Sequence, residues 1–217
     1  MKRYFSLISF VFAISAFADD YPVNAGKDAA HTHASRALNN IVLVSPNDGK
    51  QSLPVLQSTQ KYLYHDLLTS SFTALPGETL TPSFDWSGTW MNGYVYVDFG
   101  NDGSFETDVL SDGRPADGSD IVAYSSCNGR NSAGGVVSNG NVLNPPAFTL
   151  PAELPVGVYR MRYKVDWDCL DAGGNTVSGN DIVRNGGAIV DTRLVVHKPN
   201  VTLALYVGES ETPLETK

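Results

Sequence analysis

The chain has 217 residues, 15 of them basic and 23 acidic, which gives a formal net charge of −8 at pH 7. This acidic excess, with no basic cluster against it, repels phosphate groups, so we expect neither nucleic-acid binding nor docking on anionic lipid. The length is sufficient for one sizeable β domain with its own core.

Residues 1–18 have the pattern of a secretory signal peptide. Lys2 and Arg3 precede an apolar run over residues 4–17, and the Ala-Phe-Ala sequence at 16–18 predicts cleavage before Asp19. The apolar run is shorter than the about 20 residues of a membrane-spanning helix, so we expect no membrane insertion. The mature chain would carry 13 basic and 23 acidic residues and would be exported, to the periplasm, the cell surface or the medium.

The remaining chain is expected to form one all-β domain. Residues 19–37 are small and polar without periodicity, which predicts a flexible leader. From residue 38 onward, short apolar runs alternate with turn clusters, and no stretch shows helical periodicity over three turns. This pattern is typical of a two-sheet antiparallel β-sandwich, of jelly-roll or Ig-like type, over residues 38–197, followed by an extra strand and a C-terminal tail in 198–217.

The strands can be placed by their alternation and by the turns between them. In chain order, the expected strands cover residues 40–45, 79–85, 93–99, 104–110, 121–126, 156–168, 186–197 and 201–207. The stretch 61–68 fits a strand or a single helical turn. The stretches 93–99 and 104–110 are separated by four residues rich in Gly, Asn and Asp, which predicts a hairpin.

The stretch 156–168 shows the clearest alternation of two faces. Its apolar face, expected in the core, consists of Tyr159, Met161, Tyr163, Val165 and Trp167. Its charged face, expected in solvent, consists of Arg160, Arg162, Lys164, Asp166 and Asp168.

Cys127 and Cys169 are the two cysteines of the chain. An even pair in an exported protein is interpreted first as a disulfide, and closing a loop of this length contributes roughly 3–4 kcal/mol. The alternative is two free thiols. A reactive thiol favours a basic neighbour, which Arg130 offers to Cys127, but Cys169 stands among carboxylates, so the disulfide is the preferred prediction.

The stretch DFGNDGSFE, beginning at Asp98, gathers oxygen-bearing side chains around a glycine, as calcium loops do. Asp98, Asn101 and Asp102 are the candidate ligands, because calcium binds about six to eight oxygens. Glycine and valine occupy the third and twelfth positions of the EF-hand pattern, so an EF-hand is excluded. A plain turn explains the same residues, since Asn, Asp and Gly supply positive φ and side-chain hydrogen bonds to the backbone. We favour the turn and expect no cofactor; a looser calcium site remains the alternative.

Three motifs in chain order resemble the GEVED-type β-sandwich modules: YVYVDFGNDGSF, then PVGVYRMRY, then NGGAIVDTRLVV. The residues that match are Asp98, Asp102, Gly103 and Phe105, then Gly157, Arg160 and Arg162, then Gly187 and Asp191. The name-giving motif departs at Ala188, Val190 and Thr192, which stand where the family has two glutamates and a tyrosine. The resemblance covers about residues 70–197. It implies a secreted bacterial sandwich, common in Bacteroidetes-like proteins and often appended to hydrolases or adhesin-like chains, with a non-catalytic role and no well-defined ligand.

Two kinds of residue are candidates for ligand contact or chemistry. Trp86 and Trp90 could stack on sugar rings, and Trp90 is the better candidate for exposure, but a core position is the preferred interpretation of both because aromatic side chains bury large areas. The long polar loop 127–146 offers Asn128 and Arg130 as further ligand-binding residues. Asp166 and Asp168 have the spacing of a glycosidase pair, but basic residues on the same face would keep both ionised, so salt bridging is the preferred interpretation.

The sequence therefore predicts a non-catalytic binding or adhesion module that recognises a glycan or a surface protein through its loops. No nucleophile with a neighbouring base and no phosphate loop is recognisable. The alternatives are a carbohydrate-active hydrolase or its accessory subunit, and a structural subunit whose strand 201–207 adds to a neighbour's sheet.

Overall fold

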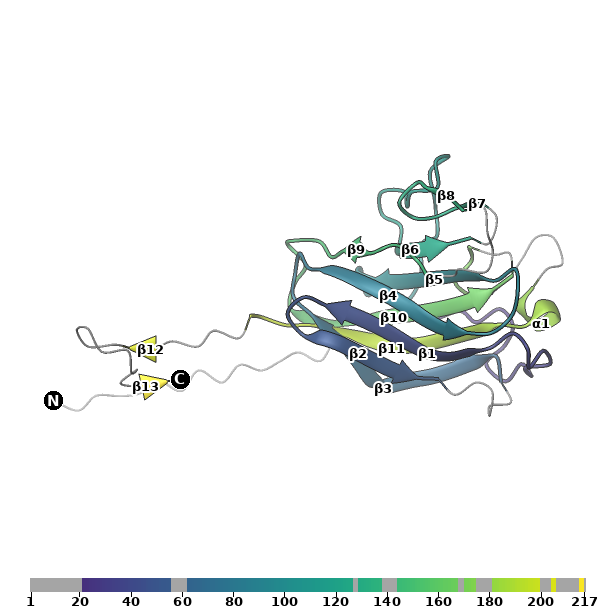
Figure 1. Cartoon of the computed structure of the whole chain (residues 1–217), viewed down its shortest axis with the longest axis horizontal. Helices are drawn as coiled ribbons and strands as arrows, with labels where there is room; N and C mark the ends of the chain where they lie inside the picture. Colours follow the sequence, from purple (N-terminus) through teal and green to yellow (C-terminus); the bar gives the residue numbers. More distant parts are fainter. Residues whose placement is uncertain are drawn as a thin grey trace.

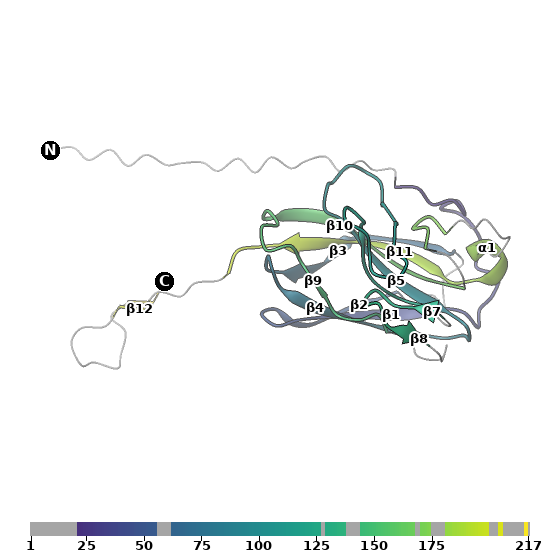
Figure 2. The same ribbon diagram turned by 90° about the horizontal axis from the view of Figure 1, so that it is seen from above.

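The fold consists of two packed β-sheets (Figures 1 and 2). The computed structural model describes residues 21–55, 62–126, 129–137, 144–167, 170–174 and 181–199, and the backbone of 204–205 and 215–216. The first sheet has the order β2 (Gly49–Pro54), β1 (Leu38–Ser45), β4 (Thr79–Trp86), β9 (Phe148–Thr149). The second has the order β3 (Tyr64–Ala74), β11 (Ala188–Val196), β10 (Gly157–Asp166), β5 (Asn92–Asp98), β6 (Ile121–Ser125).

Smaller elements lie outside the two sheets. They are the hairpin of β7 (Gly129–Arg130) and β8 (Val136–Val137), the short helix α1 (Ile182–Asn185), and the pair β12 (Ala204–Leu205) and β13 (Glu215–Thr216). The stretch expected to be a strand at 201–207 is thus a strand at 204–205. No helix among the described residues is long and apolar enough to cross a membrane.

The predicted all-β sandwich is confirmed, with one difference in strand direction. Every pair in the two large sheets is antiparallel except β11 with β3, which is parallel and contains a register shift. The five-stranded sheet is therefore mixed. The stretch 61–68, left open between strand and helical turn, falls partly in β3, a strand of 11 residues.

The main core lies between the sheets and is filled by alternate side chains of both. From the four-stranded sheet, Leu38, Ile41 and Leu43 point inward; from the five-stranded sheet, Val95 and Val97 do so. The apolar face predicted for β10 is also there, because Tyr159, Met161, Tyr163 and Val165 are buried in this cluster and Trp167 packs against it. Each such large side chain contributes roughly 1.5–3 kcal/mol by leaving water.

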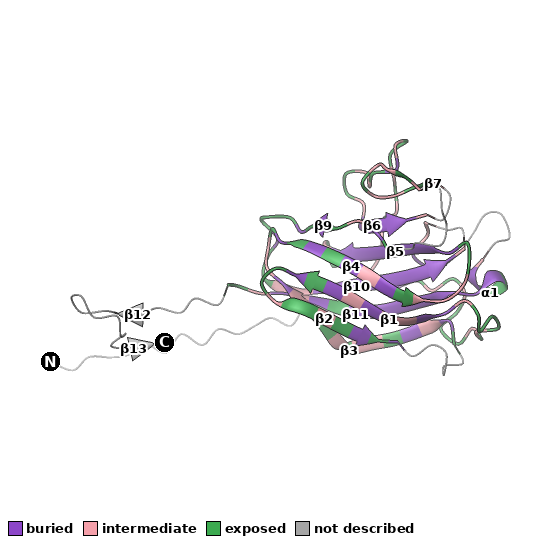
Figure 3. Cartoon of the chain, in the orientation of Figure 1, coloured by how far each residue is buried: buried purple, intermediate pink, exposed green. Residues whose placement is uncertain are grey.

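The charged face of β10 is buried as well, and the prediction that it is solvated is wrong. Every residue of the strand from Tyr159 to Asp166 is buried, and Figure 3 shows β5 and β10 buried along their length while β1 and β4 alternate. The outer face of the five-stranded sheet is covered by a second apolar cluster that includes Phe105 and Ala172. Segments remote in the sequence therefore form a third layer over this sheet.

One of these covering segments overturns the predicted hairpin. β5 pairs with β10 and β6, not with residues 104–110, where only Val109 makes an isolated bridge, with Pro115. Phe105 instead packs on the Tyr96 ring, with centroids 5.7 Å apart. Burying this aromatic ring against the sheet face outcompetes extension of the hairpin, so residues 99–120 form a long connection.

The other covering segment is residues 21–37, which the sequence predicts to be a flexible leader. Tyr21 is 2% exposed, and the N–H of Leu63 donates to the carbonyl of Ala29 at 3.0 Å. A satellite cluster joins Val23, Ala25 and Ala29 to the buried Leu63, Ile182 and Ile189. The segment is thus an ordered part of the domain. The predicted signal peptide and its cleavage site lie outside the described residues.

Candidate functional site

The connection between β4 and β5, residues 87–91, presents Trp90 to solvent. Its side chain is 54% exposed and its backbone has φ +63°, in the left-handed region. A bulky residue in that region costs about 1–2 kcal/mol. Among the described residues, Trp90 belongs to none of the hydrophobic clusters. An aromatic side chain that strains the backbone without packing in the core is of the kind found at ligand-binding sites.

The other two tryptophans of the chain lie at the same end of the sandwich. Trp86 ends β4, and Trp167 follows β10. The Asn92 side-chain amide, at the start of β5, donates to the carbonyl of Trp167 at 2.9 Å. Trp86 and Trp167 are half-buried and pack against the main core, so they anchor the strands on either side of the Trp90 loop.

Arg36 lies at the same end of the sandwich, and we call the region of Arg36, Trp90 and Trp167 the Trp90 corner. Its guanidinium lies 4.8 Å from the Trp167 ring centroid, and Nη1 donates to the carbonyl of Asn185 at 2.5 Å. The chain before it passes close to the C-terminal end of α1, since a Cβ added at Gly186 would lie 2.6 Å from the Cβ of His33. The structure thus brings an arginine from the N-terminal segment to the loop that carries Trp90.

The other residues predicted for ligand contact are not brought to this corner. Arg130 is exposed in the β7–β8 hairpin, which projects from the sandwich beside β6 (Figure 1). Its guanidinium donates to the carbonyl of Gly134 at 3.3 Å, and its Cβ would contact a Cβ added at Gly113. Asn128, Cys127 and Cys169 lie outside the described residues, so the disulfide stays a prediction.

The Asp98 loop has the geometry of a turn. Asn101 and Gly103 have positive φ, +51° and +93°. The buried Asp98 carboxylate accepts from the N–H of Gly103 at 3.2 Å, and Asp102 accepts from the N–H and hydroxyl of Ser104 at 2.9 and 2.8 Å. Over the described part of the chain, no group of three or more His, Cys, Asp or Glu side chains is placed to hold a metal ion.

Two carboxyl groups beside this loop, those of Glu106 and Asp120, share a hydrogen bond. Asp120 is buried and accepts from the N–H of Glu106 at 2.9 Å. Burial first, and then a hydrogen bond with the Glu106 side chain, raise the pKa of Asp120 to about 7. The same hydrogen bond lowers the pKa of Glu106. A pair in direct contact is closer than the roughly 5–10 Å that glycoside hydrolysis requires.

The buried charges of β10 are matched by partners from the neighbouring strand β11 and from β10 itself. Arg162 binds the Asp191 carboxylate through two donors, Nε at 2.6 Å and Nη2 at 2.9 Å, and Lys164 pairs with Asp166 at 2.8 Å. Because each charge has a partner, the cost of removing it from water is offset. Asp166 is thus enclosed rather than presented to a substrate.

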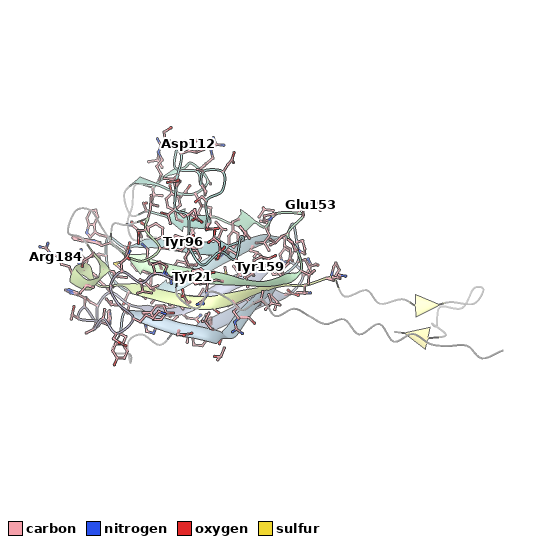
Figure 4. All side chains as sticks on the ribbon, turned by 180° about the vertical axis from the view of Figure 1, so that it is seen from behind. Tyr21, Tyr96, Asp112, Glu153, Tyr159 and Arg184 are labelled. Atoms are coloured by element: carbon pink, nitrogen blue, oxygen red, sulfur yellow. The ribbon has the colours of Figure 1, made fainter. Side chains whose placement is uncertain are left out.

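Tyr21 closes this buried network. Its hydroxyl donates to Asp98 at 2.5 Å, its ring lies 4.5 Å from the Arg160 guanidinium, and it packs on Phe105 at 4.9 Å between centroids. The next residue, Pro22, accepts from Arg162 at 2.7 Å. Figure 4 shows Tyr21 and Tyr96 on the covered side of the five-stranded sheet. Burial, and then the hydrogen bond to Asp98, raise the pKa of Tyr21, so the phenol stays neutral.

Sequence reasoning named Trp90 as a candidate but preferred a core position for it, which is wrong because Trp90 is 54% exposed. It missed Arg36 and Tyr21. Both lie in the segment that the sequence predicts to be a flexible leader. The segment has the composition of a disordered stretch, because it contributes single buried side chains to the fold rather than a regularly alternating apolar face. The one available signal was that aromatic and basic residues stand isolated in a run of small residues.

Five of the nine residues that carry the resemblance to GEVED-type modules gather at one place, although they are far apart in the sequence. Asp98, Phe105, Arg160, Arg162 and Asp191 all belong to the buried network under Tyr21. No protein-family model matches the chain, and no curated protein matches it.

Proposed function

We propose that the protein is an exported, non-catalytic binding module that recognises glycans through the corner carrying Trp90. The single observation behind this proposal is the exposed Trp90 ring on a strained loop between two core strands. Flat aromatic faces stack on sugar rings, and a rigid platform loses little conformational freedom on binding.

Other features of the structure support a binding role over catalysis. Asp166, the described member of the pair with glycosidase spacing, is buried and paired with Lys164. The carboxyl pair Glu106 and Asp120 shares a hydrogen bond and leaves no gap for a sugar. The alternatives of a hydrolase and of a structural subunit have no comparable supporting observation.

The test is a glycan array followed by titration of the strongest ligands, with intrinsic tryptophan fluorescence as the readout. Trp90→Asn should weaken binding at least tenfold. It should leave the melting temperature unchanged or higher, because asparagine tolerates the left-handed region better than tryptophan.

A matched control is Trp86→Phe, which changes a half-buried tryptophan outside the loop and should retain binding. The proposal is refuted if no glycan binds at tens of micromolar, or if Trp90→Asn binds as tightly as the natural protein. Turnover of any glycoside by the natural protein would overturn the non-catalytic assignment.

A further inference from the structure

Arg36 is an arginine that the fold uses only in part. The guanidinium has five N–H donors. Among the described residues, one hydrogen bond uses one of these donors, from Nη1 to the carbonyl of Asn185, and the guanidinium carbon lies over the Trp167 ring. No described ion pair includes Arg36. By contrast, the buried cations of β10 (Arg160, Arg162 and Lys164) are each paired with a carboxylate.

The loop that carries Trp90 lies directly against this arginine. The N–H of Ser87 donates to the carbonyl of Ala37 at 2.8 Å, and the N–H of Ala37 donates to the Ser87 hydroxyl at 3.2 Å. A Cβ added at Gly88, where φ is +115°, would lie 3.1 Å from Cγ of Arg36. Glycine at this position therefore lets the loop close onto the arginine side chain, two residues before Trp90.

The arginine is held in one orientation before any ligand arrives. The guanidinium lies over the Trp167 ring, and the carbonyl of Asn185 fixes one end of it. The side chain is half-buried. A guanidinium oriented in this way presents its remaining N–H groups as a fork that matches the two oxygens of a carboxylate. Orientation before binding reduces the entropy lost when the ligand is ordered.

We propose that the corner formed by Arg36, Trp90 and Trp167 selects acidic glycans, in which Arg36 binds a sugar carboxylate and Trp90 stacks on a sugar ring. This inference rests on the glycan-binding function proposed above and adds the chemical class of the ligand. The protein carries a net negative charge, so most of its surface repels anions. An arginine that has no carboxylate partner among the described residues attracts an anion locally. The site therefore discriminates by a short-range bidentate contact rather than by overall charge.

The experiment compares matched neutral and acidic ligands. The probes are neutral glucan, galactan and mannan oligosaccharides and the same oligosaccharides oxidised to carboxylates at C6, each titrated against the full mature protein. The natural protein should bind at least one acidic member about tenfold or more tightly than its neutral counterpart. This is the range expected for hydrogen bonds to a charged group.

Three variants separate the contributions. Arg36→Gln should abolish the preference for the acidic member while leaving Trp90-dependent binding of the neutral one. Arg36→Lys should lose most of the preference, because an ammonium group keeps the charge but has no fork. Arg184→Gln removes an exposed arginine of α1, at the same end of the molecule (Figure 4), and should change nothing. Far-ultraviolet circular dichroism and the melting temperature verify that each variant is folded.

The outcomes distinguish this inference from the function on which it rests. Equal affinity for neutral and acidic members, or an acidic preference that survives in Arg36→Gln, overturns the role of Arg36 while glycan binding through Trp90 stands. An acidic preference lost equally in Arg184→Gln shows diffuse electrostatics and also overturns it. Absence of binding to every probe, with the array also negative, refutes the glycan-binding function itself.

Discussion

Replacing Tyr21 by alanine should destabilise the whole domain, although the residue stands in a stretch with the composition of a leader. Truncating a buried aromatic side chain costs about 3–5 kcal/mol. For a domain of this size, each kcal/mol lowers the melting temperature by about 2–4 °C, so the expected decrease is about 6–20 °C. The side chain is 2% exposed, so little relaxation into solvent offsets this loss.

Tyr21→Phe separates the hydroxyl from the ring. Asp98 loses the Tyr21 donor but keeps the N–H of Gly103. The expected cost is that of one hydrogen bond to a charged group, about 1.5–3 kcal/mol, so the decrease in melting temperature should be smaller than in Tyr21→Ala. A double-mutant cycle with Asp98→Asn then measures the coupling between the two side chains.

The assay is thermal unfolding of the mature protein, followed by near-ultraviolet circular dichroism, with hydrogen exchange of β5 and β10 as a local readout. The control is Tyr62→Ala, which truncates a tyrosine that is 46% exposed and should change the unfolding free energy by no more than about 0.5 kcal/mol. A melting temperature of Tyr21→Ala within 1–2 °C of the natural protein, with exchange unchanged, would show that residues 21–37 do not hold the sheet face in solution.

Four further predictions can be checked on the same protein. Cys127 and Cys169 should be bonded in protein produced in an oxidising compartment, and mass spectrometry without reduction should show the loss of two hydrogens; two freely alkylated thiols would contradict this. Chelators and added calcium should leave the melting temperature unchanged, and a calcium-dependent rise that disappears in Asp102→Ala would instead identify an ion site. The pKa of Asp120 is about 7 in the folded protein and 3.8 in its ordinary state. Between these pH values the folded protein keeps a proton on Asp120 that the unfolded chain has released. The contribution of Asp120 to the unfolding free energy should therefore decrease as the pH rises from about 4 to 7. Denaturant titrations of Asp120→Asn should lack this contribution. Burial, with a smaller effect from His31, lowers the pKa of His65 from 6.5 to about 4. Because the unfolded chain then binds a proton more readily than the folded protein, the unfolding free energy should decrease as the pH falls from about 6.5 to 4. The variant His65→Leu should lack this acid sensitivity.

The local elements could be predicted because their signals are local. Alternation over 156–168 places β10 and assigns which side chains share a face, since a strand directs successive side chains to opposite sides. The glycine and asparagine of the Asp98 loop predict positive φ, and Asn101 and Gly103 both adopt it. The all-β class follows from repeated short runs of this type.

What covers a sheet face is not a local property. Apolar and charged side chains alternate along β10 in the same way whether the charged side faces water or protein. The prediction of a solvated face followed from this pattern and is wrong. Tyr21, Pro22 and Phe105 decide the outcome, because they supply an acceptor and aromatic faces that replace water around Arg160 and Arg162.

For the candidate site, too, one part follows from the sequence and another only from the tertiary structure. The sequence by itself determined that Trp90 stands beside turn residues at the end of a strand, because that depends only on neighbours in the chain. Only the tertiary structure decided that Arg36 meets the Trp90 loop and Trp167, since residues from three separate segments must pack together before the guanidinium can lie over the Trp167 ring with no carboxylate partner among the described residues.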